Sequence, residues 1–139
     1  MTNSTNKDNF ITKTMLSGTA NIFADRVECR YGNKGGRELV ASKPINLSYF
    51  TKLRMYGKFV YEDPNIVGEA FCGYFGVFKS DTIEKFDSVL INHAFLATKR
   101  INTLKADSYI EVDISKIKGV HSIGVLGYSQ WDNYKFEVL

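Results

Sequence analysis

The sequence predicts an all-β fold, an antiparallel β-sandwich of about seven or eight strands with at most one short helical turn. Polar and apolar residues alternate with a period of two from about residue 20 to the end, whereas helical spacing is nearly absent. Ten Phe, eight Tyr, one Trp and eleven Gly stand beside only two Pro, a composition typical of pleated, half-buried strands. The 139 residues, 44% of them hydrophobic, suffice for one core.

The N-terminal end differs from the rest of the chain. Residues 1–9 carry no apolar side chain except Met1, so no burial offsets the entropy of ordering this backbone. We expect residues 1–13 to form a flexible arm that orders against a neighbouring protein, and residues 14–139 to fold as a single sandwich domain.

The first expected strand spans residues 26–31, where apolar and charged side chains alternate. The Gly-rich stretch 32–36 can supply the backbone conformations of a hairpin turn, so we expect residues 37–41 to return as the partner strand. Pro44 ends that strand, because proline lacks the amide proton that a ladder needs.

The clearest strand spans residues 51–61 and has two unlike faces. The inward face is expected to hold Leu53, Met55, Phe59 and Tyr61. The outward face is expected to hold Lys52, Arg54, Tyr56 and Lys58. Gly57 falls on the inward face, which predicts a bulge or a close neighbour at this position.

The remaining elements follow in order. Residues 70–78 are apolar on both faces, as expected of a central strand that is covered from both sides. Asp81 and Glu84 have capping-box spacing, which predicts one helical turn. Residues 88–97 are expected to be extended and 98–107 to be a polar connection. Three last strands are expected at residues 109–114, 122–128 and 134–139.

Catalytic motifs are missing from the sequence. It contains no phosphate-binding loop, zinc-protease motif, nucleophile elbow or dinucleotide fingerprint, and we predict no catalytic residue and no enzymatic activity. His93 lies in an apolar run, where we expect a hydrogen-bonded structural role, and His121 is expected at a surface turn. We expect no cofactor, with a structural calcium ion as the alternative. Its candidate ligands are Asp63, Asn65, Asp132 and Asn133.

The outward face of residues 51–61 combines three cations with Tyr56. Such a stripe can hold phosphates and stack a base, as nucleic-acid-binding strands do. The alternative is a solvated sheet face whose charges prevent edge pairing. A net charge of only +3 does not indicate a polyanionic partner, so we prefer the second interpretation and predict no nucleic acid. No apolar run approaches the roughly 18 residues of a membrane span, and we predict no membrane partner.

Aromatic and polar residues gather in the stretch 127–134, which we expect to be a loop. Sugar rings present apolar C–H faces bordered by hydroxyl groups, so an aromatic ring beside amides and carboxylates can contact both. The candidate glycan-binding residues are Tyr128, Gln130, Trp131, Asp132 and Asn133. The alternative is that these aromatic rings cap the end of the sandwich.

The C-terminal third resembles a known pattern. The stretches 109–119, 121–127 and 134–138 resemble the closing strands of jelly-roll domains in bacteriophage head and tail appendage proteins, and residues 45–58 fit an earlier strand of those domains. The pattern is also similar to carbohydrate-binding modules of the galactose-binding type. Either resemblance implies a jelly-roll fold, and neither assigns a sugar-binding residue.

The expected cellular compartment discriminates between the two resemblances. Residues 1–9 lack the basic start and apolar stretch of a signal peptide, so we expect synthesis and assembly in a bacterial cytoplasm. The leading hypothesis is a non-enzymatic structural or adhesion protein of a phage or phage-like particle. It would contact other particle proteins through its arm and form a homo-oligomer, with a trimer favoured by analogy. Cell-surface polysaccharide is a further expected partner. The alternative is a free-standing, lectin-like carbohydrate-binding module, and the third hypothesis is a small hydrolase.

Overall fold

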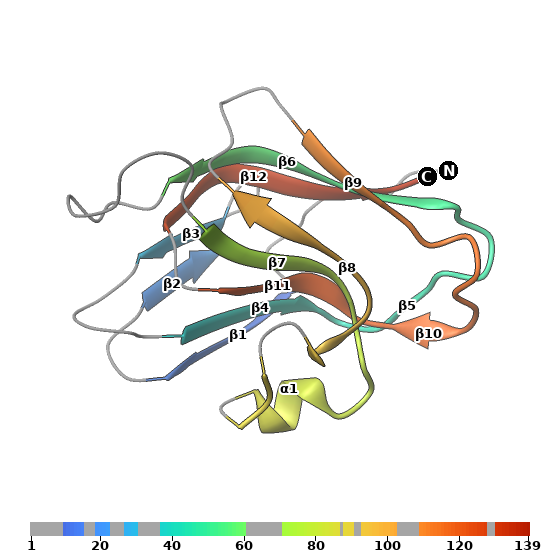
Figure 1. Cartoon of the computed structure of the whole chain (residues 1–139), viewed down its shortest axis with the longest axis horizontal. Helices are drawn as coiled ribbons and strands as arrows, with labels where there is room; N and C mark the ends of the chain where they lie inside the picture. Colours follow the sequence, from blue (N-terminus) through green and yellow to red (C-terminus); the bar gives the residue numbers. More distant parts are fainter. Residues whose placement is uncertain are drawn as a thin grey trace.

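The computed structural model places two antiparallel β-sheets face to face (Figure 1). It describes residues 10–15, 19–22, 27–30, 37–60, 71–86, 88–90, 93–102, 109–127 and 130–139. One sheet, which we call the β7 sheet, contains in spatial order β1 (Phe10–Met15), β4 (Arg37–Ser42), β11 (Ile123–Gly127), β7 (Phe71–Phe78) and β8 (Phe95–Asn102). The other, the β6 sheet, contains β2 (Thr19–Ile22), β3 (Val27–Arg30), β12 (Gln130–Val138), β6 (Lys52–Val60) and β9 (Tyr109–Asp113).

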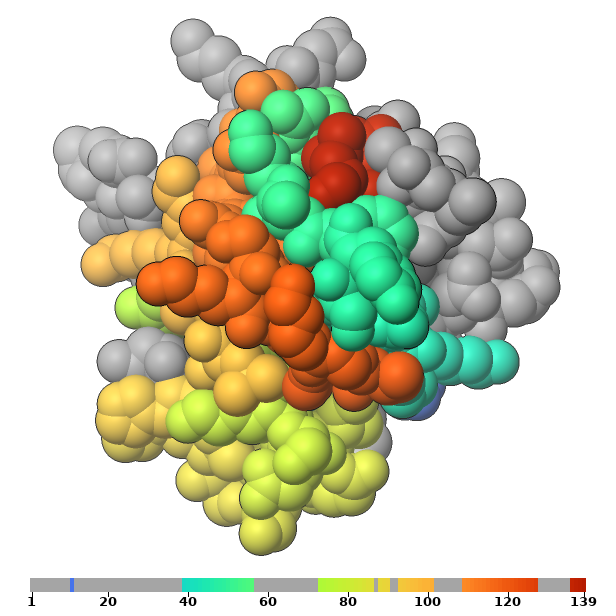
Figure 2. Space-filling view, turned by 90° about the vertical axis from the view of Figure 1, so that its right-hand side faces the viewer, coloured from blue at the N-terminus to red at the C-terminus, as the bar shows by residue number. Residues whose placement is uncertain are grey.

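A short pair of strands lies at one end of the sandwich, where β5 (Ile45–Asn46) pairs with β10 (Val120–His121). Figure 2 views this end, where the segments around residues 45–51 and 114–121 run side by side. Backbone hydrogen bonds from the Leu47 amide to the Gly119 carbonyl and from the Ile114 amide to the Thr51 carbonyl tie them together. The all-β sandwich class is therefore confirmed, although the described residues form two five-stranded sheets and this extra pair rather than seven or eight strands.

The main core lies between the two sheets. Phe75 and Val125 project from the β7 sheet, and Met55 and Phe136 project from the β6 sheet, all with at most 1% of their surface exposed. Full burial of such a side chain contributes roughly 1.5–3 kcal/mol of transfer free energy. The expected alternation of β6 is confirmed for Leu53 and Met55 inward and for Arg54 and Tyr56 outward.

A second apolar cluster covers the outer face of the β7 sheet. The segment 79–94, which contains α1 (Thr82–Lys85), packs Ile83 and Phe86 against Leu39 and Leu126 of this sheet. In Figure 1 this helical turn lies beneath the β7 sheet, on the side away from the β6 sheet. The predicted strand covered from both sides is confirmed over Phe71–Phe78, whereas residue 70 lies outside the described residues. The helix α1 confirms the predicted helical turn.

The start of α1 differs in detail from a capping box. Asp81 makes no side-chain hydrogen bond to the helix amides, and its carboxylate instead accepts one from Lys85 at 3.3 Å. The hydroxyl of Thr82 donates to the carbonyl of Ala94 at 2.9 Å, which holds the two ends of the covering segment together. None of the described helical residues forms a stretch long and apolar enough to cross a bilayer.

The expected boundaries around β8 were wrong. Residues 88–90, 93 and 94 are not in a strand but in the covering segment, and β8 runs from Phe95 through Asn102, which includes residues expected to be a connection. The reason is that β8 is the edge of its sheet, where Lys99 and Arg100 remain exposed while their backbones pair with β7. Polar composition therefore marked an edge strand and not a loop.

The predicted hairpin across residues 32–36 was also wrong. β3 pairs with β2 and β12 in the β6 sheet, whereas β4 pairs with β1 and β11 in the β7 sheet. The chain therefore crosses from one sheet to the other between residues 30 and 37. Glycines permit a turn, and alternation assigns a face, but neither selects the partner strand.

The boundary of the N-terminal arm needs a correction. Phe10 to Lys13, assigned to the flexible arm, belong to β1, which pairs with β4 in a register that places Phe10 opposite Ser42. The apolar residues Phe10 and Ile11 could have indicated this strand, but its partner β4 is distant in sequence and gave no local signal. Residues 1–9 lie outside the described residues, where the arm stays a prediction.

Gly57 coincides with an irregularity of the β6 sheet. Tyr56 pairs with Lys135 and Lys58 pairs with Asp132, so two residues of β12 lie opposite the single Gly57. This two-against-one count defines a β-bulge. The prediction of a bulge at this position is confirmed, with the extra residue in the partner strand.

Replacing Gly124 with alanine is expected to destabilise the domain by about 2 kcal/mol or more. The added Cβ would lie 1.9 Å from the carbonyl oxygen of Val40 and 2.9 Å from the Cα of Ala41, so the pairing of β4 with β11 would have to shift. Urea unfolding measures the change, with the exposed Lys116 replaced by alanine as a control expected to cost under about 0.5 kcal/mol. Equal unfolding midpoints for the two variants would contradict the register of β11.

Candidate functional site

The outer face of the β6 sheet carries charged and aromatic side chains from three adjacent strands. The register places Tyr56 of β6 opposite Tyr109 of β9, and it places Arg54 opposite both Glu111 of β9 and Glu137 of β12. Residues directly opposite each other share a face and lie within side-chain contact. We call the set Lys52, Arg54, Tyr56, Tyr109, Glu111 and Glu137 the sheet-face cluster.

Hydrogen bonds connect the cluster across the strands. Arg54 Nε donates to Glu111 Oε1 at 2.6 Å, and an Arg54 Nη lies 3.4 Å from the Tyr56 hydroxyl oxygen. The Tyr56 hydroxyl in turn donates to Glu137 Oε1 at 3.1 Å. Lys52 Nζ lies 3.9 Å from the second carboxylate oxygen of Glu111. The cluster is thus a connected network with fixed side-chain orientations.

The two tyrosine rings lie beside this network. Their centroids are 5.3 Å apart with the ring planes tilted by 47°, a separation favourable for aromatic pairs. The guanidinium carbon of Arg54 lies 4.6 Å from the centroid of the Tyr109 ring, within cation–π distance. Tyr109 nevertheless keeps 48% of its surface exposed. An ordered aromatic ring is therefore presented to solvent.

The positive and negative charges of the sheet-face cluster balance. Hydrogen bonding to Glu111 and to Tyr56 raises the pKa of Arg54 above its ordinary value. The hydrogen bond from Arg54 is the main cause that lowers the pKa of Glu111, so both groups are charged at neutral pH. Within the cluster, two cations, Lys52 and Arg54, accompany two carboxylates, Glu111 and Glu137. The basic stripe of β6 is therefore neutralised by the strands on either side of it.

Part of this cluster was predicted. Lys52, Arg54 and Tyr56 contribute to it, and Lys58 lies further along β6 opposite Asp132. Sequence reasoning missed Tyr109, Glu111 and Glu137. The available signal was the alternation within residues 109–113 and 134–138, where polar and aromatic side chains repeat at every second position.

The candidate glycan-binding loop was assigned the wrong structure. Gln130, Trp131, Asp132 and Asn133 belong to β12, the central strand of the β6 sheet, and Tyr128 lies outside the described residues. Trp131 pairs with Phe59 on one side and with Cys29 on the other. Aromatic residues favour strands, and the polar pair that suggested a loop lies in β12, with Asp132 paired to Lys58 and Asn133 in the bulge opposite Gly57.

The correction brings the two predicted sets of residues together. β12 and β6 are adjacent, with Gln130 opposite Val60, Trp131 opposite Phe59 and Asp132 opposite Lys58. The residues that we treated as a separate loop site thus continue the same two strands that carry Arg54, Tyr56 and Glu137.

The histidines and candidate metal ligands fall elsewhere. His93 is exposed instead of lying within an apolar strand, whereas His121 is half-buried in β10 with its Nε2 at 2.8 Å from the Lys118 carbonyl oxygen. Among the residues that the structure describes, no three His, Cys, Asp or Glu are grouped so that they could hold a metal ion. Asp63 and Asn65 lie outside the described residues, and calcium stays a prediction.

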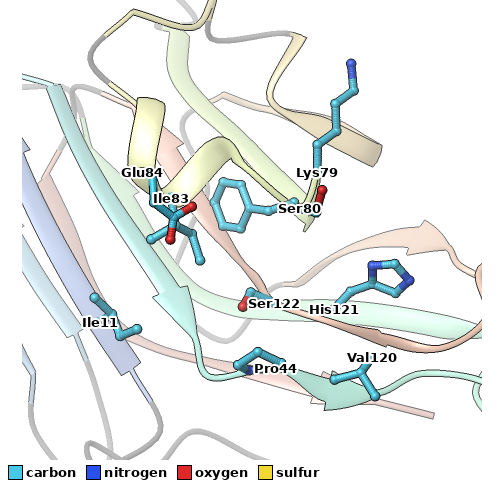
Figure 3. A pocket seen from close by; sticks show the side chains of 10 residues that line it. Ile11, Pro44, Lys79, Ser80, Ile83, Glu84, Val120, His121 and Ser122 are labelled. Atoms are coloured by element: carbon cyan, nitrogen blue, oxygen red, sulfur yellow. The ribbon is translucent and has the colours of Figure 1, made fainter.

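A cavity of about 390 Å³ lies where the segment around α1 meets the ends of β4 and β10 (Figure 3). Five apolar and five polar residues line it, which are Ile11, Pro44, Phe78, Ile83, Val120, Lys79, Ser80, Glu84, His121 and Ser122. It is separate from the sheet-face cluster, because α1 covers the β7 sheet and the cluster lies on the outer face of the β6 sheet.

Comparisons with known proteins identify the class of fold. No family model matches the chain, and no curated protein matches it. A family 11 carbohydrate-binding module from Clostridium thermocellum, solved in complex with a β-1,3-1,4-mixed-linked tetrasaccharide, is 9% identical with a TM-score of 0.55, over 99% of this chain and 95% of that one. The family 11 module of the cellulosomal cellulase Lic26A-Cel5E of the same organism is 11% identical with a TM-score of 0.51, over 94% and 87%.

At this level of identity the similarity establishes the fold alone. The chain has the antiparallel jelly-roll sandwich of these modules, as the resemblance noted in its sequence implied. Neither comparison structure is a phage protein, and neither bears on the arm or on assembly.

Glu111→Gln is expected to lower thermal stability at neutral pH and to have little effect in acid. Because Arg54 holds the folded-state pKa of Glu111 below the ordinary value of 4.5, the ion pair stabilises the fold above that pH. This stabilisation is lost as the pH falls through the lowered, folded-state pKa. Melting temperatures of the wild type and the variant should therefore differ most near neutral pH and converge once the pH is below the lowered pKa of Glu111.

The control for this comparison is Glu84→Gln, which alters an exposed carboxylate that makes no ion pair within the described residues. A difference between wild type and Glu111→Gln that stays constant from neutral to acid pH would contradict the role given to the Arg54 ion pair.

Proposed function

We propose that this protein is a non-catalytic carbohydrate-binding domain that binds a neutral polysaccharide across the outer face of the β6 sheet. The observation that carries the proposal is the ordered pair of Tyr56 and Tyr109 beside Arg54, Glu111 and Glu137 on the outer face of the β6 sheet. The similarity in fold to two carbohydrate-binding modules, one solved with an oligosaccharide, supports it.

The chemistry of the sheet-face cluster suits both surfaces of a sugar. The exposed part of the Tyr109 ring can stack against the apolar C–H face of a pyranose. Guanidinium and carboxylate groups hydrogen-bond strongly to neutral hydroxyls, donating from Arg54 and accepting at Glu111 and Glu137. Since the network already fixes these side chains, binding loses less conformational entropy than it would with mobile groups.

The balance of charge favours a neutral ligand. A polyanion needs a surplus of Lys and Arg on the surface that binds it. Here Glu111 and Glu137 flank Arg54 on both sides and would repel a phosphate, sulfate or uronate group. An open face formed by three strands also suits internal residues of an extended glycan better than it suits a small isolated molecule.

The comparisons support the carbohydrate-binding alternative over the particle protein favoured from sequence. Attachment to a phage particle, trimer formation and cytoplasmic assembly stay predictions. Co-sedimentation of the purified protein with phage heads or tails tests the predicted attachment to a particle. The remaining hypothesis from sequence, a small hydrolase, would require turnover of a glycan.

Tyr109→Ala is expected to weaken binding to a soluble β-1,3-1,4-mixed-linked glucan by at least about tenfold, because truncating an anchoring aromatic side chain removes most of its contact. Affinity gel electrophoresis followed by calorimetry measures the change. Tyr49→Ala is the matched control, since Tyr49 is 88% exposed on a turn at the end of the sandwich. The control should bind as the wild type does, and both variants should melt near the wild-type temperature.

A third variant, Trp131→Ala, separates the cluster from the residues predicted first. Loss of binding in Trp131→Ala with full binding in Tyr109→Ala would move the site along β12 and contradict the role of the sheet-face cluster. Stronger binding to an anionic glycan than to the neutral glucan would contradict the argument from charge.

A further inference from the structure

The cavity beside α1 combines an apolar wall with polar groups, as binding sites for small molecules do. Its apolar wall comes from Phe78, Ile83 and Pro44, and its polar groups come from two separate segments, residues 79–84 and 121–122 (Figure 3). The cavity therefore depends on the fold to bring its lining together. No single stretch of sequence indicates it.

Ser122 is a buried polar residue whose side chain has no hydrogen-bond partner among the described residues. Only 7% of its surface is exposed, and its carbonyl oxygen accepts a hydrogen bond from the Phe78 amide at 2.9 Å. Its hydroxyl makes no hydrogen bond to the part of the chain that the structure describes, and Figure 3 shows this hydroxyl directed toward the cavity. A buried hydroxyl without a partner is unfavourable, so a group that hydrogen-bonds to it there is stabilised.

The rim of the cavity offers further free groups. The side chains of Lys79, Ser80 and Glu84 make no hydrogen bond or ion pair within the described residues. Ser80 and Glu84 supply a hydroxyl and an anionic acceptor to the lining, whereas the Lys79 side chain extends away from the cavity (Figure 3). These groups contrast with those of the sheet-face cluster, which already bond to one another.

The size and chemistry of the cavity select the ligand. Small-molecule sites have volumes of about 300–1,000 Å³, and this cavity of about 390 Å³ lies at the small end of that range. A purely apolar ligand would leave the hydroxyl of Ser122 without a hydrogen bond, and the carboxylate of Glu84 disfavours an anionic ligand. A single pyranose has apolar C–H faces for Phe78 and Ile83 and hydroxyls that both donate and accept.

We propose that this cavity binds one neutral sugar residue, at the end or on a branch of a glycan chain. The inference rests on the proposed function in one respect, namely that the protein recognises carbohydrate. Because the cavity lies by the covered face of the β7 sheet and the sheet-face cluster lies on the opposite side of the sandwich, the two sites bind independently (Figure 1). A domain with both sites would contact the internal sugar residues of a glycan at the sheet face and a terminal or branch residue in the cavity.

The test titrates ¹⁵N-labelled protein with the methyl glycosides of glucose, galactose, mannose and xylose, one at a time. At least one glycoside should shift the amide resonances of residues 79–84 and 120–122. Ser122→Ala should weaken that binding by about tenfold, the loss expected for one hydrogen bond. Ser88→Ala, which alters an exposed serine of the covering segment, should bind as the wild type does.

The two proposals fail separately. Tyr109→Ala should lose the soluble glucan and keep the methyl glycoside, and Ser122→Ala should do the reverse while melting near the wild-type temperature. The cavity is not a sugar site if no glycoside shifts the amide resonances of residues 79–84 and 120–122, or if Ser122→Ala binds the glycoside as tightly as the wild type does. Binding of the glucan would in either case still support the proposal for the sheet face.

Discussion

The pairing of β6 with β9 on one side and with β12 on the other is the constraint on which the account depends. It places Arg54 between two carboxylates and beside two tyrosine rings, at distances of 2.6 Å to Glu111 and 4.6 Å to the Tyr109 centroid. The same register buries Leu53, Met55 and Phe136 in the main core. A slip of one residue would exchange these two faces, so packing of the core also fixes the geometry of the site.

The two outer faces of the sandwich have different roles. The β7 sheet is apolar on its outer face and is covered by the segment 79–94, which adds a second core and leaves a cavity at its margin. The outer face of the β6 sheet carries charged and aromatic side chains linked by hydrogen bonds. One face therefore stabilises the domain, and the other presents polar and aromatic groups outward.

The sequence allowed the prediction of the fold class and of one strand of the site, because alternation over residues 52–56 separates inward from outward side chains. It did not reveal the partners of that strand, since Arg54 and Glu111 are 57 residues apart in sequence and only the pairing of β6 with β9 joins them. Asp132 and Asn133 suggested a loop by composition, but both belong to β12, where Asp132 pairs with Lys58 and Asn133 lies in the bulge opposite Gly57. The cavity around Ser122 has no local signature, because its lining comes from distant segments.

The central claim, that the outer face of the β6 sheet binds a neutral glycan, is tested most directly by locating a bound oligosaccharide. Amide chemical shifts of the labelled protein, followed during titration with a β-1,3-1,4-mixed-linked tetrasaccharide, locate it in solution. The account predicts that the largest changes fall on β6 and β9, at residues 54–56 and 109–111. Saturable binding whose changes avoid these residues, or no change at any concentration tested, would contradict it.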